Sequence, residues 1–257
     1  MIRSRVFPVL LLTGSGLIKT KQFRRYKYLG DVINTLKIFN ELNVDELCIF
    51  GLDPNQKSKS IDFSILKKIS REASMPLCYG GGINSVDDAK RLIDLGYEKI
   101  SLNTVLYDNF SVVSEIITTI GGQSVVATID YKSNIFGKMV PYSHCGLKKQ
   151  NTKVEALIMK LNSAGVAEIV FQSIDRDGMR RGFDIDRLVE IKSQTKCQIS
   201  LVGGCASSSD IDLADSTLGP LGIGVGSHFV FNGKLDAVLV SYERSSKAST
   251  VSSVSNA

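Results

Sequence analysis

The chain has 257 residues and carries 31 Lys and Arg against 26 Asp and Glu, which gives a formal net charge of +5, and 43% of its residues are hydrophobic. This composition excludes a disordered chain, and the small, dispersed charge excess does not indicate nucleic-acid binding. The five cysteines contain no C-x-x-C pair and there are only two histidines, so we expect no disulfide framework, no metal site, no cofactor, and a reducing cytoplasm as the location.

Short apolar runs rich in β-branched residues alternate along the chain with longer amphipathic stretches. The first run, 6–12, is too short to span a bilayer and lacks a signal-peptide cleavage site, so it predicts a buried strand and no membrane segment. Strands are predicted at 6–12, 46–52, 76–79, 99–102, 125–129, 168–173, 198–202 and 222–225. Helices are predicted at 31–42, 62–72, 85–95, 112–120, 153–164, 184–195 and 208–215.

Strands that look buried on both faces and are joined by helices form parallel sheets. Eight such units predict an α/β fold, a closed (βα)8 TIM barrel forming one domain over 1–244 rather than two domains. Residues 245–257 are Ser-rich without apolar periodicity, which predicts a disordered tail.

The second half of the chain repeats features of the first. Gly80-Gly81-Gly82 recurs as Gly203-Gly204-Cys205, and Asn103-Thr104 recurs as Gly226-Ser227, each 123 residues later. The shared spacing predicts a twofold half-barrel repeat, with halves at about 1–122 and 123–244.

The repeated segments follow predicted strands, and the C-terminal ends of the strands carry the active site in barrels of this type. Glycines let a phosphate approach backbone N–H groups, and a helix N-terminus adds a favourable dipole. Each cluster alone is more simply a tight turn, but two matching clusters predict two phosphate sites across one mouth, for a substrate with a phosphate at each end. The candidate phosphate-binding residues are Gly81, Gly82, Asn103, Thr104, Asp177, Gly178, Gly203, Gly204, Gly226 and Ser227.

A carboxylate, Asp130, ends the fifth predicted strand and is the best acid/base candidate, because partial desolvation there would raise its pKa. It could instead cap the following turn. Asp177-Gly178 also reads as a plain turn signal. The locally basic segment 19–25 is typical of solvated surface but could attract a phosphorylated substrate.

Four segments together resemble the cyclase subunit of imidazole glycerol phosphate synthase, from histidine biosynthesis, over roughly residues 1–242. They are Ser173-Ile174-Asp175-Arg176-Asp177-Gly178, Gly80-Gly81-Gly82-Ile83, Ser101-Leu102-Asn103-Thr104 and Ile129-Asp130. The first is specific to that family, whereas a triple glycine after a strand occurs in many phosphate-binding barrels. The resemblance implies a (βα)8 barrel that binds a bis-phosphorylated ribonucleotide at its upper face, while a glutaminase subunit docks on the bottom face and sends ammonia through the barrel.

In that family a ring of charged residues at the bottom of the strands gates the ammonia channel. The matching residues are Arg5, Glu46, Lys99 and Glu168, all of the expected type. Unpaired charges inside a barrel base are costly, so these residues are expected to pair. Read without the family, they serve equally well as a salt-bridge plug that only closes the bottom.

The family's mouth is less well matched. The second acid/base aspartate, at the end of the first strand, is Leu11 here, and the acidic residue ending the second strand is Gly51, with Asp53 as a nearby substitute. General acid/base groups typically supply about 10²- to 10⁴-fold, so Leu11 should cripple cyclisation. Lys19, which matches the family's mobile-loop lysine, and Asp130 are retained.

This pattern resembles divergent cyclase-like subunits of bacterial surface-polysaccharide (lipopolysaccharide) pathways. The resemblance implies that they relay ammonia from a glutaminase and work with a sugar amidotransferase to install acetamidino groups. Two alternatives stay open: an authentic histidine-pathway cyclase, and a non-catalytic activator of a glutaminase. We further expect 13–29 and 130–151 to be mobile segments that shape the mouth, and His144 to be a surface residue.

Overall fold

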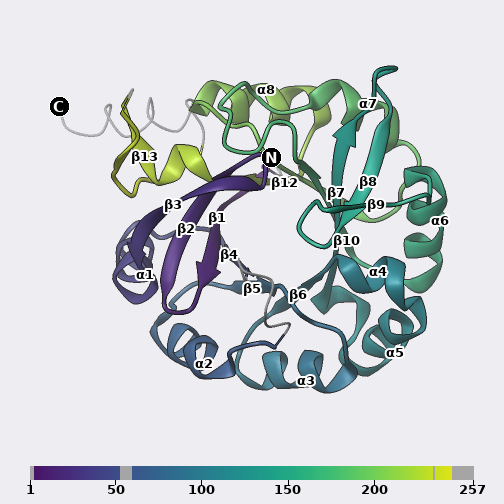
Figure 1. The fold of residues 1–257 in the computed structure, drawn as a ribbon, viewed down its shortest axis with the longest axis horizontal. Coiled ribbons are helices and arrows are strands. Elements are labelled where there is room, and N and C mark those ends of the chain that lie inside the picture. The colour runs from purple at the N-terminus through teal and green to yellow at the C-terminus, as the bar shows by residue number, and fades with distance from the viewer. Residues whose placement is uncertain (1–2, 53–59, 234, 245–257) are drawn as a thin grey trace.

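The computed structural model describes residues 3–52, 60–233 and 235–244, and within them eight parallel strands close into a barrel (Figure 1). In order around the barrel they are β1 (Arg5–Thr13), β4 (Leu47–Gly51), β5 (Leu77–Gly80), β6 (Lys99–Leu102), β7 (Val125–Ser133), β10 (Glu168–Ser173), β11 (Gln198–Val202) and β12 (Gly222–Val225). Parallel pairing of β12 with β1 closes the ring. The predicted (βα)8 barrel is therefore confirmed.

Helices surround the barrel and cover the outer faces of its strands. They are α1 (Val32–Glu41), α2 (Phe63–Glu72), α3 (Val86–Asp94), α4 (Thr104–Asp108), α5 (Phe110–Ile120), α6 (Val154–Ala164), α7 (Ile185–Lys192) and α8 (Ser208–Leu218). In α2 the Asp62 side chain caps the first turn by accepting from the backbone N–H of Ser64, and Leu66 and Ile69 are buried on one face. Capping and an apolar stripe of this kind explain the agreement with the sequence pattern.

The core has two layers, because side chains of each strand alternate between the helices and the barrel interior. On β7, Ala127 and Ile129 belong to the large outer cluster, while Val126 belongs to the inner one. The inner cluster comprises Phe7, Val9, Cys48, Cys78, Val126, Val170 and Val202. The same alternation directs Asp130 into the barrel at its upper end.

Two antiparallel hairpins rise from the mouth. β1 continues into β2 (Gly16–Lys21) and β3 (Arg24–Asp31), and β7 continues into β8 (Met139–Ser143) and β9 (Lys148–Lys149). Both segments border the mouth and contain hydrogen-bonded strands, and their mobility stays a prediction. Their outer residues are largely exposed, so they carry little apolar periodicity for a sequence prediction to detect.

After β12 the described chain continues as η2 (Ser227–Phe229) and a small hairpin, β13 (Phe231–Asn232) with β14 (Ala237–Val238). Residues 239–244 have no regular secondary structure, and we call them the C-terminal strap. The Tyr242 hydroxyl donates to the Val6 carbonyl at 3.0 Å, and Arg244 pairs with Asp45 at 3.0 Å. The strap therefore ties the end of the described chain to the starts of β1 and β4.

Two expectations cannot be compared with the fold, because Asp53 and the tail 245–257 lie outside the described residues. In the described part of the chain, no helix combines the length and apolar character needed to cross a membrane.

Candidate active site

Four alternating charges meet at the bottom of the barrel, where strands begin. Arg5, Lys99 and Glu168 are the first residues of β1, β6 and β10, and Glu46 immediately precedes β4. Arg5 lies 3.0 Å from Glu46 and 2.5 Å from Glu168. Lys99 lies 3.1 Å from Glu46 and 3.0 Å from Glu168. Each charge thus contacts two of opposite sign, and we call this set the charge ring.

Burial disfavours the charged form of every member of the charge ring. For Arg5, Lys99 and Glu168, the opposite charges nearby outweigh this effect on the pKa. Desolvation would raise the pKa of Glu168, yet Arg5 and Lys99 hold it below its usual value. Desolvation dominates at Glu46 and raises its pKa. For both cations desolvation is overcome by the glutamates, so the pKa values of Arg5 and Lys99 are raised. Ser200 also donates a hydrogen bond to Glu168.

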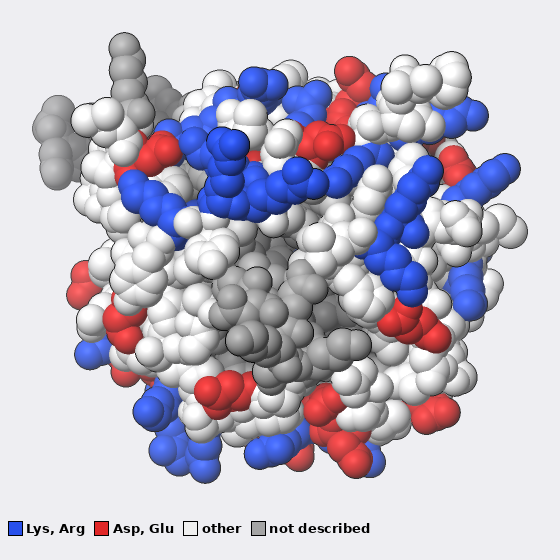
Figure 2. Space-filling view, in the orientation of Figure 1, with Lys and Arg blue, Asp and Glu red and all other residues white. Residues whose placement is uncertain are grey.

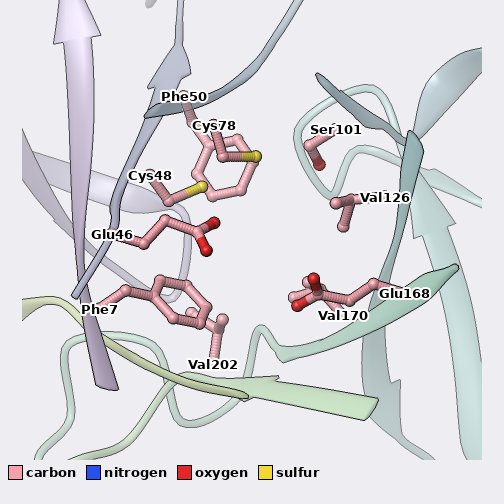
Figure 3. Close-up of a pocket in the computed structure, with 10 residues that line it drawn as sticks. All are labelled: Phe7, Glu46, Cys48, Phe50, Cys78, Ser101, Val126, Glu168, Val170 and Val202. Carbon is pink, nitrogen blue, oxygen red and sulfur yellow. The ribbon is translucent and has the colours of Figure 1, made fainter. Parts of the chain in front are cut away.

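A small cavity lies directly above the charge ring (Figure 3). Glu46 and Glu168 approach its base from opposite sides, and its walls are apolar side chains and thiols, with Ser101 at one edge. About 10 Å³ is open to the centre of a water-sized molecule, which is close to the minimum for a single water or ammonia. The pKa of the Cys78 thiol is raised by its hydrogen bond with Cys48 and by burial, so the wall there stays uncharged.

At the opposite end, the first predicted phosphate cluster forms a tight cradle after β5 and β6. Gly81 and Gly82 have φ values of 116° and 74°, which favour glycine. A Cβ on Gly81 would clash with the Gly51 carbonyl. Asn103 donates to the Thr128 carbonyl at 2.9 Å, and the Thr104 hydroxyl accepts from the backbone N–H of His144 at 3.2 Å.

The second cluster has the same design after β11 and β12. Gly203 and Gly204 have φ values of 100° and 108°, and a Cβ on Gly204 would clash with the Gly182 carbonyl. Gly226 and Ser227 occupy the same positions relative to η2 as Asn103 and Thr104 do to α4.

The structure corrects the register of the half-barrel repeat in one respect. Gly81 and Gly203 each directly follow a strand, β5 and β11, so they occupy equivalent positions in the two half-barrels. Their separation along the sequence is one residue shorter than the predicted spacing. The helix caps Ser85 and Ser207 follow that closer register. The segment before β12 is one residue longer than its counterpart before β6, which restores the longer spacing for Asn103 and Gly226. Comparison of the sequence letters alone does not separate the two spacings.

Asp130 is buried at the top of the barrel interior. Desolvation, and to a lesser extent the nearby Asp177, raise its pKa to about 8. No described residue donates a hydrogen bond to its carboxylate. The predicted acid/base group is therefore placed where it can hold or release a proton near neutral pH, and it does not cap the following turn.

Asp177 and Lys19 connect the β2–β3 hairpin to the barrel mouth. The Thr20 hydroxyl donates to the Asp177 carboxylate at 2.7 Å, and a Cβ on Gly178 would clash with the Thr20 carbonyl. Lys19 is buried and donates to the Val9 carbonyl at 2.6 Å. Desolvation lowers its pKa to about 8, although Asp177 opposes this. Lys19 thus lies inside the mouth beside Gly226, where a Cβ would meet its ammonium at 2.5 Å.

The two family positions that lack carboxylates are filled by apolar and aromatic groups. Leu11 is buried and pairs with Ile18 of β2 and Phe50 of β4. Gly51 has no room for a side chain, because a Cβ there would clash with the hydroxyl of Tyr79. Sequence reasoning missed Tyr79, because its contact with Gly51 depends on the pairing of β4 with β5. His144 lies in the turn between β8 and β9, where it is partly exposed, and its ring lies 3.5 Å from the Asp108 carboxylate.

Comparison with known proteins agrees with this geometry. The sequence matches the family described as Histidine biosynthesis protein over residues 5–236. It is 38% identical over 243 residues, 94% of each chain, to a provisionally named imidazole glycerol phosphate synthase subunit hisF3 of Vibrio vulnificus. It is 39% identical to a provisionally named subunit hisF2 of Pseudomonas aeruginosa, over 94% of this chain and 96% of the relative. An imidazole glycerol phosphate synthase subunit HisF of Campylobacter lari is 29% identical over 80% of this chain and 83% of its own. The barrel therefore belongs to the histidine biosynthesis protein family, as a relative of the cyclase subunits of imidazole glycerol phosphate synthase.

Proposed function

We propose that this barrel receives ammonia from a glutaminase docked at its bottom face and passes it to the mouth. The observation that carries the proposal is the charge ring lying directly below an apolar cavity. Burying an ion in such a cavity is costly, so neutral ammonia can pass where ammonium cannot. With all four charges paired, the ring is closed, and passage requires at least one of its ion pairs to separate.

The residues of the mouth favour an ammonia acceptor other than the histidine-pathway nucleotide. Leu11 removes one of the family's two acid/base groups, and Gly51 supplies no carboxylate at the family's acidic position after the second barrel strand. The two glycine cradles would still hold phosphate groups, through backbone N–H groups and the ammonium of Lys19. We propose that the ammonia is used to amidinate a sugar of a surface polysaccharide, in concert with a sugar amidotransferase. The resemblance to divergent cyclase-like subunits supports this step.

The ring can be tested in the complete system of barrel, glutaminase and sugar amidotransferase. Lys99→Met removes the ammonium that contacts both glutamates, and Lys90→Met on the exposed side of α3 is the matched control. We expect Lys99→Met to lower the acetamidino product formed per glutamine hydrolysed, while Lys90→Met leaves that ratio unchanged. An unchanged ratio in Lys99→Met would reduce the ring to a structural plug and overturn the ammonia relay.

A second candidate, the histidine-pathway cyclase, is favoured by Asp130, whose pKa of about 8 suits acid/base work. It is tested with the purified chain, an excess of ammonium salt and the pathway's bis-phosphorylated substrate, phosphoribulosyl-formimino carboxamide ribotide. We expect binding without turnover, because Leu11 supplies no proton. Leu11→Asp should then raise turnover, by up to about 10²- to 10⁴-fold, and Leu11→Asn serves as its uncharged control. Rapid turnover by the unaltered chain would instead establish the cyclase.

A further inference from the structure

A groove lined by cations lies beside the second glycine cradle, at the edge of the mouth. Its cations come from three segments: Lys19 and Lys21 on β2, Arg25 and Lys27 on β3, and Arg180 on the loop after β10. About 120 Å³ is open there to the centres of water-sized molecules, far more than in the barrel interior. Figure 2 shows a row of Lys and Arg side chains crossing the upper part of this face. We call this feature the basic groove.

Two cations of the basic groove, Lys27 and Arg180, are held in place by the β13–β14 hairpin. Lys27 donates to the Asp236 carbonyl at 2.8 Å, and its ammonium lies 5.2 Å from the centroid of the Phe231 ring. Arg180 donates to the Phe231 carbonyl at 3.3 Å and also lies over that ring, at 5.8 Å. Cation–π contacts and backbone hydrogen bonds fix long side chains that would otherwise lose rotamer freedom on binding a ligand.

The positive charge of the basic groove is only partly balanced. Asp236 is the one acidic residue among those lining it, and its carboxylate contacts both Arg180, at 3.2 Å, and Lys21, at 3.6 Å. Asp177 lies near Lys19 but does not line the groove, so the five cations outnumber the nearby carboxylates and create a positive potential, which favours an anion. Guanidinium and ammonium groups bind phosphate oxygens through charge-assisted hydrogen bonds.

The basic groove is continuous with the second glycine cradle, because Gly178 and Ser227 line the same pocket as the cations. A phosphate held by the cradle would therefore have its next substituent directed along the groove. We propose that the ligand carries a diphosphate at this end, with one phosphate on the glycine cradle and the second among Lys27, Arg180 and Lys21. This inference rests on the phosphate-binding role proposed above for the cradle, and it assigns the ligand class as a diphosphate ester.

Binding of inorganic pyrophosphate and of orthophosphate to the purified full chain, measured by calorimetry at low ionic strength, tests the proposal. We expect pyrophosphate to bind at least about tenfold more tightly than orthophosphate, since it alone reaches both positions. Lys27→Gln should weaken pyrophosphate at least about fivefold and leave orthophosphate nearly unchanged. Asp236→Asn should act in the opposite direction and tighten pyrophosphate, because it removes the competing carboxylate. Lys138→Gln, an exposed change on the β7–β8 turn, is the control.

Equal affinity for the two anions, or equal effects of Lys27→Gln and Lys138→Gln, would overturn the proposal. Thermal unfolding of each variant separates a lost contact from a lost fold, and the opposed signs of Lys27→Gln and Asp236→Asn cannot both arise from unfolding. The outcome is independent of the ammonia relay. If Lys99→Met uncouples glutamine hydrolysis but pyrophosphate is not preferred, only the diphosphate proposal fails; if pyrophosphate is preferred and coupling is unchanged, the relay fails.

Discussion

The two ends of the barrel treat charge in opposite ways. At the bottom, every member of the charge ring contacts two opposite charges, and the net effect keeps Glu168 ionised. At the mouth, Asp130 has no hydrogen-bond donor among the described residues and its pKa is raised, while burial lowers the pKa of Lys19. The bottom is thus electrostatically complete in the free protein, whereas the mouth holds groups that a ligand would complete.

The largest effect is expected from breaking the charge ring. Glu168→Ala leaves Arg5 and Lys99 with one carboxylate between them and removes the acceptor of Ser200. Loss of one partner from a buried ionic network typically costs about 3–5 kcal/mol in the free energy of unfolding. Urea unfolding measures this loss, with Glu155→Ala on the exposed face of α6 as control. A loss no greater than that of the control would mean that the ring is not a compensated network.

A steric test at the upper ends of β4 and β5, on the side that faces the helices, should give a smaller effect. Gly51→Ala places a methyl group against the Tyr79 hydroxyl, and overpacking of this kind typically costs about 1–3 kcal/mol. Tyr79→Phe removes that hydroxyl, so the double variant should recover much of the stability lost by Gly51→Ala, as seen in urea midpoints. Tyr79→Phe alone is the reference. Without such recovery, the absence of a side chain at position 51 has another cause.

The pH dependence of stability tests the raised pKa of Asp130 at the mouth. Because the Asp130 pKa is raised from 3.8 to about 8, the folded chain retains a proton that the unfolded chain releases across this window. Stability should therefore fall as pH rises through it. Asp130→Asn should flatten this fall, while Asp94→Asn on exposed α3 should not. Urea unfolding over this pH range provides the measurement, and an unchanged slope in Asp130→Asn would place the titration elsewhere.

The smallest effect is expected at the contact between hairpin and mouth. Thr20→Val keeps the side-chain shape but removes the hydroxyl that donates to Asp177 at 2.7 Å. A hydrogen bond to a charged group contributes about 1.5–3 kcal/mol at most. Burial raises the pKa of Asp177 and so favours its neutral form. We therefore expect a loss of about 1 kcal/mol in the free energy of unfolding. Faster amide exchange in β2, measured with Thr35→Val as control, would locate the loss at the hairpin.

The sequence predicted the barrel strands closely, because they are short apolar runs bounded by polar turns. The expected strands at 168–173 and 222–225 coincide with β10 and β12. It did not predict β3, whose residues are mostly exposed and polar, or α4, which has a single helical turn. Tertiary pairing stabilises both elements, and that pairing leaves little periodicity in the sequence.

The residues of the candidate site also fall into those that the sequence predicts and those that it does not. Glycines with positive φ and a carboxylate ending a buried strand are visible in sequence, because local backbone geometry requires them. The charge ring could be predicted only through the family resemblance, because its members come from four separate strands. The Gly51–Tyr79 contact and the anchoring of Lys27 and Arg180 on Phe231 depend on register and on the path of the chain after β12, which no local pattern specifies.

The C-terminal strap has a consequence for how the molecule is made. Tyr242 and Arg244 bond to the starts of β1 and β4, next to Arg5 and Glu46. During synthesis the chain emerges from its N-terminus, so these contacts form only after residues 242–244 have left the ribosome. The base of the barrel is therefore among the last parts of the molecule to be completed, and an incomplete chain would offer an unfinished surface to any partner that binds there.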